Sequence, residues 1–463
     1  MTTFTAVVTT GIYCRPEDTG RPGPRDVRLF PLAASAEVAG FRACLRCRPY
    51  RLAPSAAGLG PELVCRAVQL VLDGVLDEGT EHDLGARLGI SARQLRRLFS
   101  QHLGLTPDQL ARSARAHFAR RLLDETDLPF AELAFAAGYG SVRQFNRACV
   151  EIFRATPTEL RAQRRAADRL AADGGLALRL AHEAPLDWDA MLDYLAARAI
   201  PGVESVSAGI YRRTIRIDGD PGVLEMWPGG PDHLVLRAHL PRWGGLLHVV
   251  RRARRIFGLE ADAESANSQL GADPVVGGLI RSRPGMRPPG TWDPFEAGVA
   301  VIVAGSASQG GAGQDDAASV LGRLAGRHGT AVPGLTRLGL THMFPEPGVL
   351  AAADLSGLGL DAGRAAAVRA YACAVASSKA QPDRVEHFDE FLDVVTQADG
   401  VSEQTAQGLA FRLGRADAFP AGDPALLRGL ASALGRPVTP ADAARAAERW
   451  RPWRAHAAAH LYR

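Results

Sequence analysis

The stretch His82-Asp-Leu-Gly-Ala-Arg-Leu-Gly-Ile-Ser91, continued by Arg93-Gln-Leu-Arg-Arg-Leu-Phe99, has the form of a helix-turn-helix. The small residue Ala86 lets a short first helix pack closely against its neighbour, and Gly89 suits the turn that follows. Ser91 is a favourable N-cap for a second helix. The polar side chains of this second helix, of types that contact base edges and phosphates, are Arg93, Gln94, Arg96 and Arg97.

A second unit of the same form lies fifty residues downstream, at Ala131–Ser141 followed by Val142–Arg147. Taken alone, either unit also fits a small helical bundle with exposed arginines. Two units joined by a helix through Arg112–Leu123 are a more specific signal of DNA binding. The polar side chains of the second unit are Arg143, Gln144, Asn146 and Arg147.

The pair of units resembles the AraC-type DNA-binding domain over residues 60–164. The resemblance implies that two recognition helices, about Ser91–His102 and Ser141–Phe153, enter successive major-groove segments of double-stranded promoter DNA. It also implies transcription regulation, for which RNA polymerase is an expected partner.

The length and composition set the remaining limits. A chain of 463 residues exceeds the roughly 250–300 residues that one core accommodates, so we expect several domains. The net charge of +4 is too small to indicate a polyanionic partner by itself. No signal-peptide pattern is visible, and no apolar run approaches the ~18 residues that span a bilayer. We therefore expect a cytoplasmic protein without a membrane partner.

The N-terminal cysteines form a candidate metal site. Cys44-Leu-Arg-Cys47 is a CxxC pair, and Cys14 lies thirty residues upstream. A tetrahedral zinc site needs four ligands, and a CxxC turn supplies two of them. A redox pair or two buried thiols would show the same spacing, so the spacing leaves these alternatives open.

The surrounding residues resemble the Ada-type methyl-sensing zinc domain over residues 1–52, in a form shortened at the N-terminus. The similar stretches are Val8–Pro16, Asp26–Phe30 and Ala39–Pro49. The resemblance implies zinc held by Cys14, Asp18, Cys44 and Cys47, with Cys14 accepting a methyl group from a DNA phosphotriester. Asp18 stands where the family has a cysteine. A carboxylate in place of a thiolate ligand makes the Cys14 sulfur a poorer nucleophile.

The pattern after the helix-turn-helix region is mixed. Arg161–Arg179 is predicted to be a linker or an exposed helix. The chain from Trp292 onward is predicted to be mostly helical. Residues 1–50, by contrast, show little helical periodicity. Period-2 and apolar runs predict an α+β region after residue 176. Its predicted strands are Leu176–Leu180, Thr214–Ile217 and His233–His239, with a helix at Asp187–Ala197 among them.

The second half of the chain resembles 3-methyladenine DNA glycosylase II, a hydrolase of N-glycosyl bonds. The similar stretches are Ala196–Glu204, Leu270–Pro274, Asp417–Pro420 and Glu448–Arg454. The resemblance implies an α+β domain at residues 177–288 and an all-α helix-hairpin-helix core at residues 289–463. The predicted protein is thus multidomain and mainly α, with α+β parts.

Asp423 is the candidate catalytic residue of this half. A single Asp in front of a helix is usually an N-cap. The resemblance implies instead that Asp423 stabilises the positive charge that develops on the sugar, or activates water, while an extruded base stacks among aromatic side chains. It places Trp453 and Tyr462 in the base pocket.

Two DNA-gripping segments depart from the family pattern. The hairpin keeps Gly400 as a DNA-contacting residue, but Ser402 replaces its second glycine and Gln404 replaces the pocket tryptophan. The strand-wedging segment reads Gly305-Ser-Ala-Ser308, whose serines are too small to fill the gap left by an extruded base.

Together, the three resemblances predict a response protein for DNA alkylation damage that combines regulation with base excision. The alternative is a DNA-binding regulator with an inactive glycosylase domain.

Overall fold

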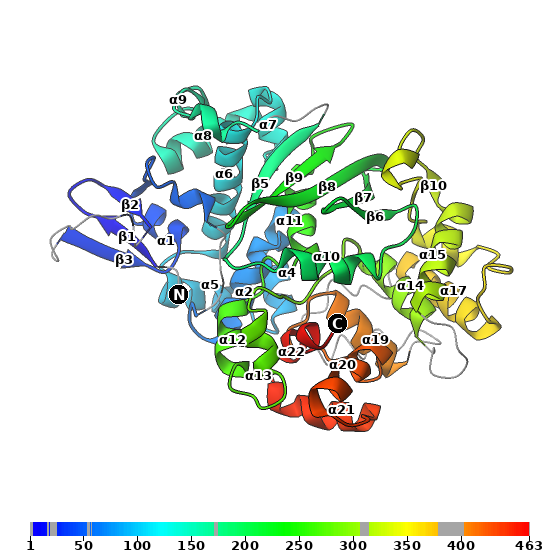
Figure 1. Ribbon diagram of the computed structural model, residues 1–463. Helices are drawn as coiled ribbons and strands as arrows, with labels where there is room; N and C mark the ends of the chain where they lie inside the picture. The colour runs from blue at the N-terminus through cyan, green and yellow to red at the C-terminus, as the bar shows by residue number, and fades with distance from the viewer. Residues whose placement is uncertain are drawn as a thin grey trace. The chain divides into compact units, whose positions relative to one another are not determined.

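The computed structural model describes residues 3–15, 18, 26–52, 56, 58–170, 175–305, 314–377 and 402–462 (Figure 1). The chain forms two compact units. The first comprises Met1–His182 with Arg242–Arg251, and the second comprises Glu183–Pro241 with Arg252–Arg463. In the described residues no helix combines the length and the apolar character needed to cross a bilayer. The predicted multidomain, helix-rich architecture with sheet parts is confirmed.

A small sheet opens the first unit, with strand order β3-β1-β2-β4. Its strands are β1 (Phe4–Val7), β2 (Ile12–Cys14), β3 (Val27–Phe30) and β4 (Arg42–Ala43). Contrary to the low helical periodicity, helix α1 (Ala33–Val38) forms between β3 and β4. Six residues make fewer than two turns, which is too short for a periodic pattern to show.

Helices make up the rest of the first unit, and the two predicted helix-turn-helix motifs are present. The helices are α2 (Glu62–Leu72), α3 (Val75–Glu78), α4 (Glu81–Arg87), α5 (Ala92–Leu103), α6 (Pro107–Glu125), α7 (Phe130–Ala136), α8 (Val142–Phe153) and α9 (Pro157–Ala162). Ser91 and Ser141 cap α5 and α8 by accepting the backbone N–H three residues on. The joining helix α6 begins at a capping box between Thr106 and Gln109.

The segment after α9 is more than the predicted linker. A short 3-10 helix η4 (Ala166–Asp168) carries the buried Asp168, which accepts a hydrogen bond from Arg48 and pairs with Arg51 at 3.0 Å. Strand β5 (Leu176–Ala181) follows and confirms the predicted strand. This anchoring of the segment at Asp168 could not be predicted, because Arg48 and Arg51 lie far away in the sequence.

The second unit contains an antiparallel run of four strands in the order β9-β8-β7-β6. Their bounds are β6 (Glu204–Ser207), β7 (Ile210–Ile217), β8 (Asp220–Gly230) and β9 (His233–His239), and helix α10 (Trp188–Ala196) precedes them. The turns Ala208-Gly209 and Asp218-Gly219 have positive φ at both residues, as tight hairpins require. The predicted strands β7 and β9 are confirmed. β8 escaped prediction because Pro221 and Pro228 interrupt its pattern.

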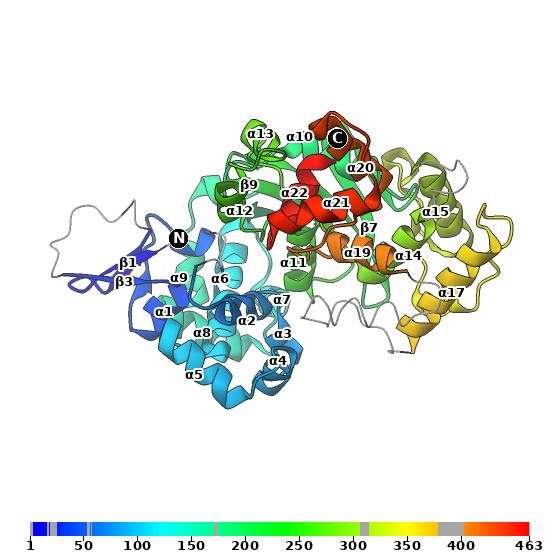
Figure 2. The same ribbon diagram turned by 90° about the horizontal axis from the view of Figure 1, so that it is seen from below.

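The remaining chain is helical, apart from the short pair β10 (Thr330–Ala331) and β11 (His342–Met343). The helices are α11 (Leu246–Ile256), α12 (Ala263–Leu270), α13 (Gly277–Ser282), α14 (Pro294–Ala304), α15 (Gln314–His328), α16 (Pro347–Ala351), α17 (Ala362–Ala376), α19 (Glu403–Arg412), α20 (Pro424–Leu434), α21 (Pro440–Ala447) and α22 (Arg454–Leu461), with the 3-10 turns η6 (Thr336–Leu338) and η7 (Glu448–Trp450). Figures 1 and 2 show that α19, α20, α21 and α22 lie close together near the C-terminus.

Candidate functional site

Strand pairing brings three cysteines together in the first unit. Cys14 ends β2 and Cys44 directly follows β4, and these two strands are parallel neighbours. The N–H of Cys44 donates to the carbonyl of Tyr13 at 3.0 Å, which fixes this register. A tight turn then carries Cys47 back, and the three Sγ atoms lie within 4.8 Å of one another.

The chemistry of this trio suits a zinc ion. Burial raises the pKa of all three thiols, and the net direction is upward at Cys14 and Cys47. At Cys44, hydrogen bonds from the backbone of Cys47 and Arg46 lower the pKa, and the net direction is downward. A thiol whose pKa is lowered gives up its proton to a metal readily. Three half-buried sulfurs at this spacing supply three of the four ligands of a structural zinc site.

Asp18 is not part of this group. Its side chain is exposed. Among the described residues, the group whose ligand atoms lie close enough together to hold one metal ion consists of Cys14, Cys44 and Cys47. The residues flanking Asp18 lie outside the described chain.

Cys47→Ala removes a ligand and should strip zinc from the protein, because two remaining thiolates hold the ion far more weakly than three. The measurement is the zinc content of the purified chain by elemental analysis. Cys373→Ala, which alters an exposed cysteine on α17, is the matched control and should keep the wild-type zinc content. Wild-type zinc in Cys47→Ala would exclude this cluster as the site.

Glu37 of α1 joins the cysteine cluster to the helix-turn-helix region. Its Oε1 accepts a hydrogen bond from the hydroxyl of Tyr13 at 2.7 Å and lies 2.6 Å from Nε2 of His117. Its Oε2 accepts from Ser113 Oγ at 2.6 Å. Tyr13 adjoins Cys14, and Ser113 and His117 belong to α6. A continuous polar contact therefore runs from the candidate metal site to the helix between the two motifs.

The two recognition helices present the same pattern of burial. The core residues of α5 are Leu95, Phe99 and Leu103, and those of α8 are Phe145, Cys149 and Phe153, an offset of fifty residues at each position. All eight predicted DNA-contacting side chains of these helices are exposed: Arg93, Gln94, Arg96, Arg97, Arg143, Gln144, Asn146 and Arg147.

Two of these side chains are engaged within the protein. Arg96 pairs with Glu81 of α4, and the Gln144 side chain accepts a hydrogen bond from the N–H of Gly140 at 3.2 Å. An Arg that pairs with a carboxylate must exchange that partner for a phosphate or a base edge when DNA binds. The better candidates for the strongest contacts are therefore the arginines of these helices that make no such contact within the described residues, namely Arg93, Arg97, Arg143 and Arg147.

Arg143→Ala should weaken promoter binding and lower the slope of log affinity against log salt concentration by about 1, because one phosphate-neutralising charge is lost. The measurement is a salt titration of binding to a promoter fragment by fluorescence anisotropy. Arg369→Ala, an exposed arginine of α17 in the second unit, should leave both quantities unchanged. An unchanged slope in Arg143→Ala would remove α8 from the DNA interface.

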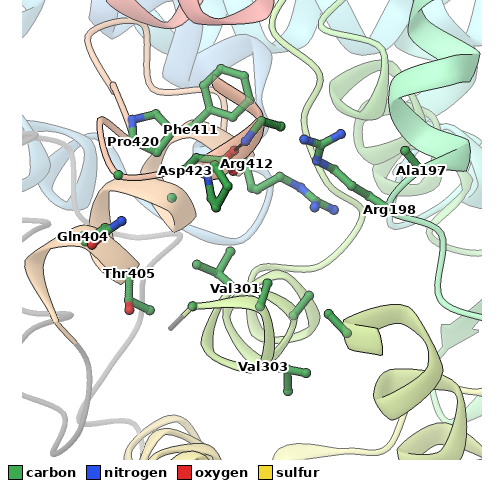
Figure 3. A pocket seen from close by; sticks show the side chains of 18 of the residues that line it. Ala197, Arg198, Val301, Val303, Gln404, Thr405, Phe411, Arg412, Pro420 and Asp423 are labelled. Carbon is green, nitrogen blue, oxygen red and sulfur yellow. Dashed lines mark hydrogen bonds between the residues drawn. The ribbon is translucent and has the colours of Figure 1, made fainter. Parts of the chain in front are cut away.

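A cavity of about 460 Å³ lies in the second unit beside the start of α20 (Figure 3). Its walls come from α10, α14, α15, α17, α19 and α20, together with Tyr462 directly after α22. This volume lies in the range of about 300–1,000 Å³ that is typical of small-molecule sites. The cavity is therefore large enough for one extruded base.

Asp423 lines this cavity and also caps α20. Its Oδ1 accepts from the N–H groups of Ala425 at 2.8 Å and Leu426 at 3.1 Å. Burial raises the pKa of Tyr462 well above its usual value, and the charge of the nearby Asp423 raises it further, so this hydroxyl stays protonated beside the carboxylate. The capping and the catalytic interpretation of Asp423 are thus compatible.

The other predicted site residues of this half are placed differently. Ser402 and Gly305 line the cavity, and Ser402 also caps α19. Trp453 is not among the described lining residues, and its Nε1 donates to Gln269 Oε1 at 2.9 Å. Gly400 and the serines of the wedging segment lie outside the described residues.

Sequence analysis gave no role to Tyr194 and Arg198 in the cavity wall. Tyr194 and Arg198 belong to α10 and the turn after it, far from Asp423 in the sequence, yet both line the cavity. Arg198 lies within Ala196–Glu204, a stretch already singled out for its family resemblance, so the signal was present without an assigned role. Gln404 also lines the cavity, at the position where the family has an aromatic side chain.

Three family models match the chain. "Metal binding domain of Ada" matches residues 2–50, "Helix-turn-helix domain" matches residues 84–163, and "AlkA N-terminal domain" matches residues 177–293. Together they cover the cysteine cluster, the two helix-turn-helix motifs and the α+β region.

Full-length similarity extends across all of these parts. The chain is 38% identical over 465 residues to a Mycobacterium tuberculosis protein named "Probable bifunctional transcriptional activator/DNA repair enzyme AlkA", with 99% of this chain and 92% of that protein covered. It is 30% identical over 286 residues to "DNA-3-methyladenine glycosylase 2" of Escherichia coli, covering 60% of this chain and 94% of the relative. The fold of the 3-methyladenine DNA glycosylase from Archaeoglobus fulgidus matches 61% of this chain and 96% of its own length, with a TM-score of 0.51 and 19% identity.

Proposed function

This chain belongs to the family of bifunctional transcriptional activator/DNA repair enzymes AlkA, and from this premise we propose that it joins promoter-specific DNA binding to the excision of alkylated bases. The observation that carries the enzymatic part is Asp423, whose carboxylate lines a base-sized cavity beside the protonated hydroxyl of Tyr462. DNA is the partner of both halves.

The proposed chemistry needs one well-placed carboxylate. An alkylated purine of the 3-methyladenine type carries a positive charge and is a good leaving group. As the bond from C1′ to the base nitrogen breaks, its electron pair goes to the base and positive charge develops on the sugar. A carboxylate beside the sugar stabilises this charge, and a water oxygen then bonds to C1′ while its proton leaves. Asp423 is fixed for this task by its hydrogen bonds to α20.

The regulatory half supports a damage-responsive role. Two capped recognition helices expose their polar side chains, and the cysteine cluster contacts the joining helix α6 through Glu37. We propose zinc as the ion held by Cys14, Cys44 and Cys47, with methyl transfer to Cys14 as the signal. Activation of transcription would bring RNA polymerase to the promoter as a second partner. Binding to chromosomal DNA agrees with the expected cytoplasmic location.

A regulator with an inactive glycosylase domain is the second candidate function. Gln404 favours it, because an amide at the cavity rim stacks on a base less well than the family's aromatic ring. A Cβ added at Gly422 would come within 1.6 Å of Gln404 Nε2, so the amide lies directly against the loop that carries Asp423.

Base release distinguishes the two candidates. The purified full chain is incubated with methylated duplex DNA, and free methylated bases are separated from the polymer and quantified. Release of 3-methyladenine above the spontaneous rate supports the enzyme. No release by a folded chain that still binds its promoter supports the regulator.

A further inference from the structure

The two recognition helices end in contacts with two different segments of the N-terminal domain. Leu103 is the last residue of α5 and Phe153 the last residue of α8, and the fifty-residue offset makes these positions equivalent. The carbonyl of Leu103 accepts a hydrogen bond from Ser35 Oγ of α1 at 2.6 Å. The ring of Phe153 packs edge-on against that of Tyr50, with the centroids 6.1 Å apart. One recognition helix is therefore held by α1, and the other by the segment that follows the cysteine turn.

The turn from Cys44 to Cys47 determines where Tyr50 lies. The N–H of Arg48 donates to the carbonyl of Cys44 at 3.0 Å and closes this turn. Arg48 has a φ of 52°, a left-handed conformation that a residue other than glycine keeps only when its surroundings impose it. The 3-10 helix η3 (Pro49–Arg51), which carries Tyr50, begins at the next residue. A change in the turn is therefore passed directly to Tyr50.

A buried ion cluster fixes the same segment against α6. The guanidinium of Arg48 donates to Asp168 and lies 3.7 Å from Oδ2 of Asp124. The hydroxyl of Tyr50 donates to Asp124 Oδ2 at 2.9 Å. Asp124 is fully buried in α6, and Arg48 and Asp168 are buried as well. Because a buried ion that loses its partner destabilises a protein strongly, these groups keep one arrangement.

The ion cluster also reaches the helix that follows α8. Asp124 Oδ1 pairs with Arg120 at 3.1 Å, and Arg120 Nη1 donates to the carbonyl of Leu160 in α9 at 2.7 Å. Strand β4, which directly precedes Cys44, packs against α8 as well. The cysteine turn is thus linked to α8 on both sides, through β4 before it and through Tyr50 after it.

We propose that the cysteine turn positions the second recognition helix through Tyr50, and that loss of metal from Cys14, Cys44 and Cys47 therefore releases α8 while α5 stays in place. This inference rests on the proposed zinc site. Tyr50 is a positioning residue, since it acts on DNA binding through α8.

The difference between the two helices follows from the path of the chain. A shared ion ties the turn to β2, which ends at Cys14. Without the ion the turn keeps only its hydrogen bonds, and the left-handed Arg48 can relax. Tyr50 then moves away from Phe153. Ser35 belongs to α1, so its contact with the end of α5 does not pass through the turn.

Hydrogen–deuterium exchange of the free full-length chain tests this support, because it requires neither DNA nor base release. The zinc-loaded chain is compared with the chain stripped by a chelator, and peptides that cover α5 and α8 are followed by mass spectrometry. We expect the amides of α8 to exchange at least about tenfold faster after stripping, since an edge-on aromatic pair and a hydrogen bond together contribute that much. The amides of α5 should exchange at an unchanged rate, and added zinc should restore α8. Equal acceleration in both helices, or none in either, would overturn the proposal.

Tyr50→Ala separates the support from the metal. In the zinc-loaded chain it should reproduce the exchange pattern of the stripped chain at an unchanged zinc content, because it leaves the three thiols in place. Tyr50→Phe keeps the ring against Phe153 and should restore most of the slow exchange. Ser35→Ala is the matched control, and it should accelerate exchange in α5 only, with or without zinc. A chain that holds no zinc yet speeds up α8 in Tyr50→Ala would refute the zinc site and keep the role of Tyr50. Slow exchange of α8 in Tyr50→Ala would refute that role.

Promoter affinity gives the consequence for DNA binding. Arg143→Ala of α8 should weaken binding in the zinc-loaded chain and have little further effect in the stripped chain, because α8 has already been released. Arg97→Ala of α5 should weaken binding by the same factor in both. Both affinities are measured by fluorescence anisotropy on one promoter fragment. An equal loss from Arg143→Ala with and without zinc contradicts the release of α8, whereas a zinc-loaded chain that does not bind the promoter contradicts the proposed regulatory function instead.

Discussion

Asp423→Asn abolishes the release of methylated bases, with an expected loss of at least ~100-fold in the single-turnover rate, because a neutral amide cannot balance positive charge on the sugar. Asparagine caps a helix about as well as aspartate. The amide oxygen can still accept from the N–H groups of Ala425 and Leu426, so α20 should remain folded. The loss would thus report on the charge alone.

The chain contains a matched control for this substitution. Asp293 precedes Pro294 and caps α14 by accepting from the N–H groups of Phe295 at 2.9 Å and Glu296 at 3.0 Å, the same arrangement as at Asp423. Asp293 does not line the cavity. Asp293→Asn should therefore keep wild-type base release. Undiminished release in Asp423→Asn would show that this carboxylate serves α20 only as a cap.

The sequence predicted most reliably what local contacts determine. The recognition helices begin at Ser91 and Ser141 because a serine cap acts within three residues, and their arginines are exposed because the core positions repeat every four residues. Asp423 could also be found, since its capping motif and its family stretch are both local. For these features no knowledge of distant chain segments was needed.

The rest depends on contacts between distant segments. Arg198 reaches the cavity because the chain after α10 lies beside Tyr462, far away in the sequence. Arg48 pairs with Asp168 because packing within the first unit brings these distant segments together. Trp453 illustrates the opposite case. Its family stretch placed it in the base pocket, but Gln269, from another helix, accepts its indole N–H outside the described cavity wall.

Gly429→Ala should destabilise the second unit by about 1–3 kcal/mol and lower base release as well. A Cβ at Gly429 would lie 1.9 Å from the carbonyl oxygen of Leu461 and 2.9 Å from its carbonyl carbon. Both are backbone atoms, so the clash cannot be relieved by rotating a side chain. The helices α20 and α22 must separate instead, and Tyr462 directly follows Leu461.

The helical glycine Gly326 separates this packing effect from the general effect of alanine on a helix. A Cβ at Gly326 of α15 meets no atom within 4 Å, so Gly326→Ala should be neutral or stabilising by up to about 1 kcal/mol. Chemical denaturation followed by tryptophan fluorescence measures both variants, and base release is assayed in parallel. Wild-type stability in Gly429→Ala would mean that α20 and α22 are not held this closely. Wild-type stability with lost release is also informative, because it would show that the small distance between these helices chiefly serves to keep Tyr462 beside Asp423.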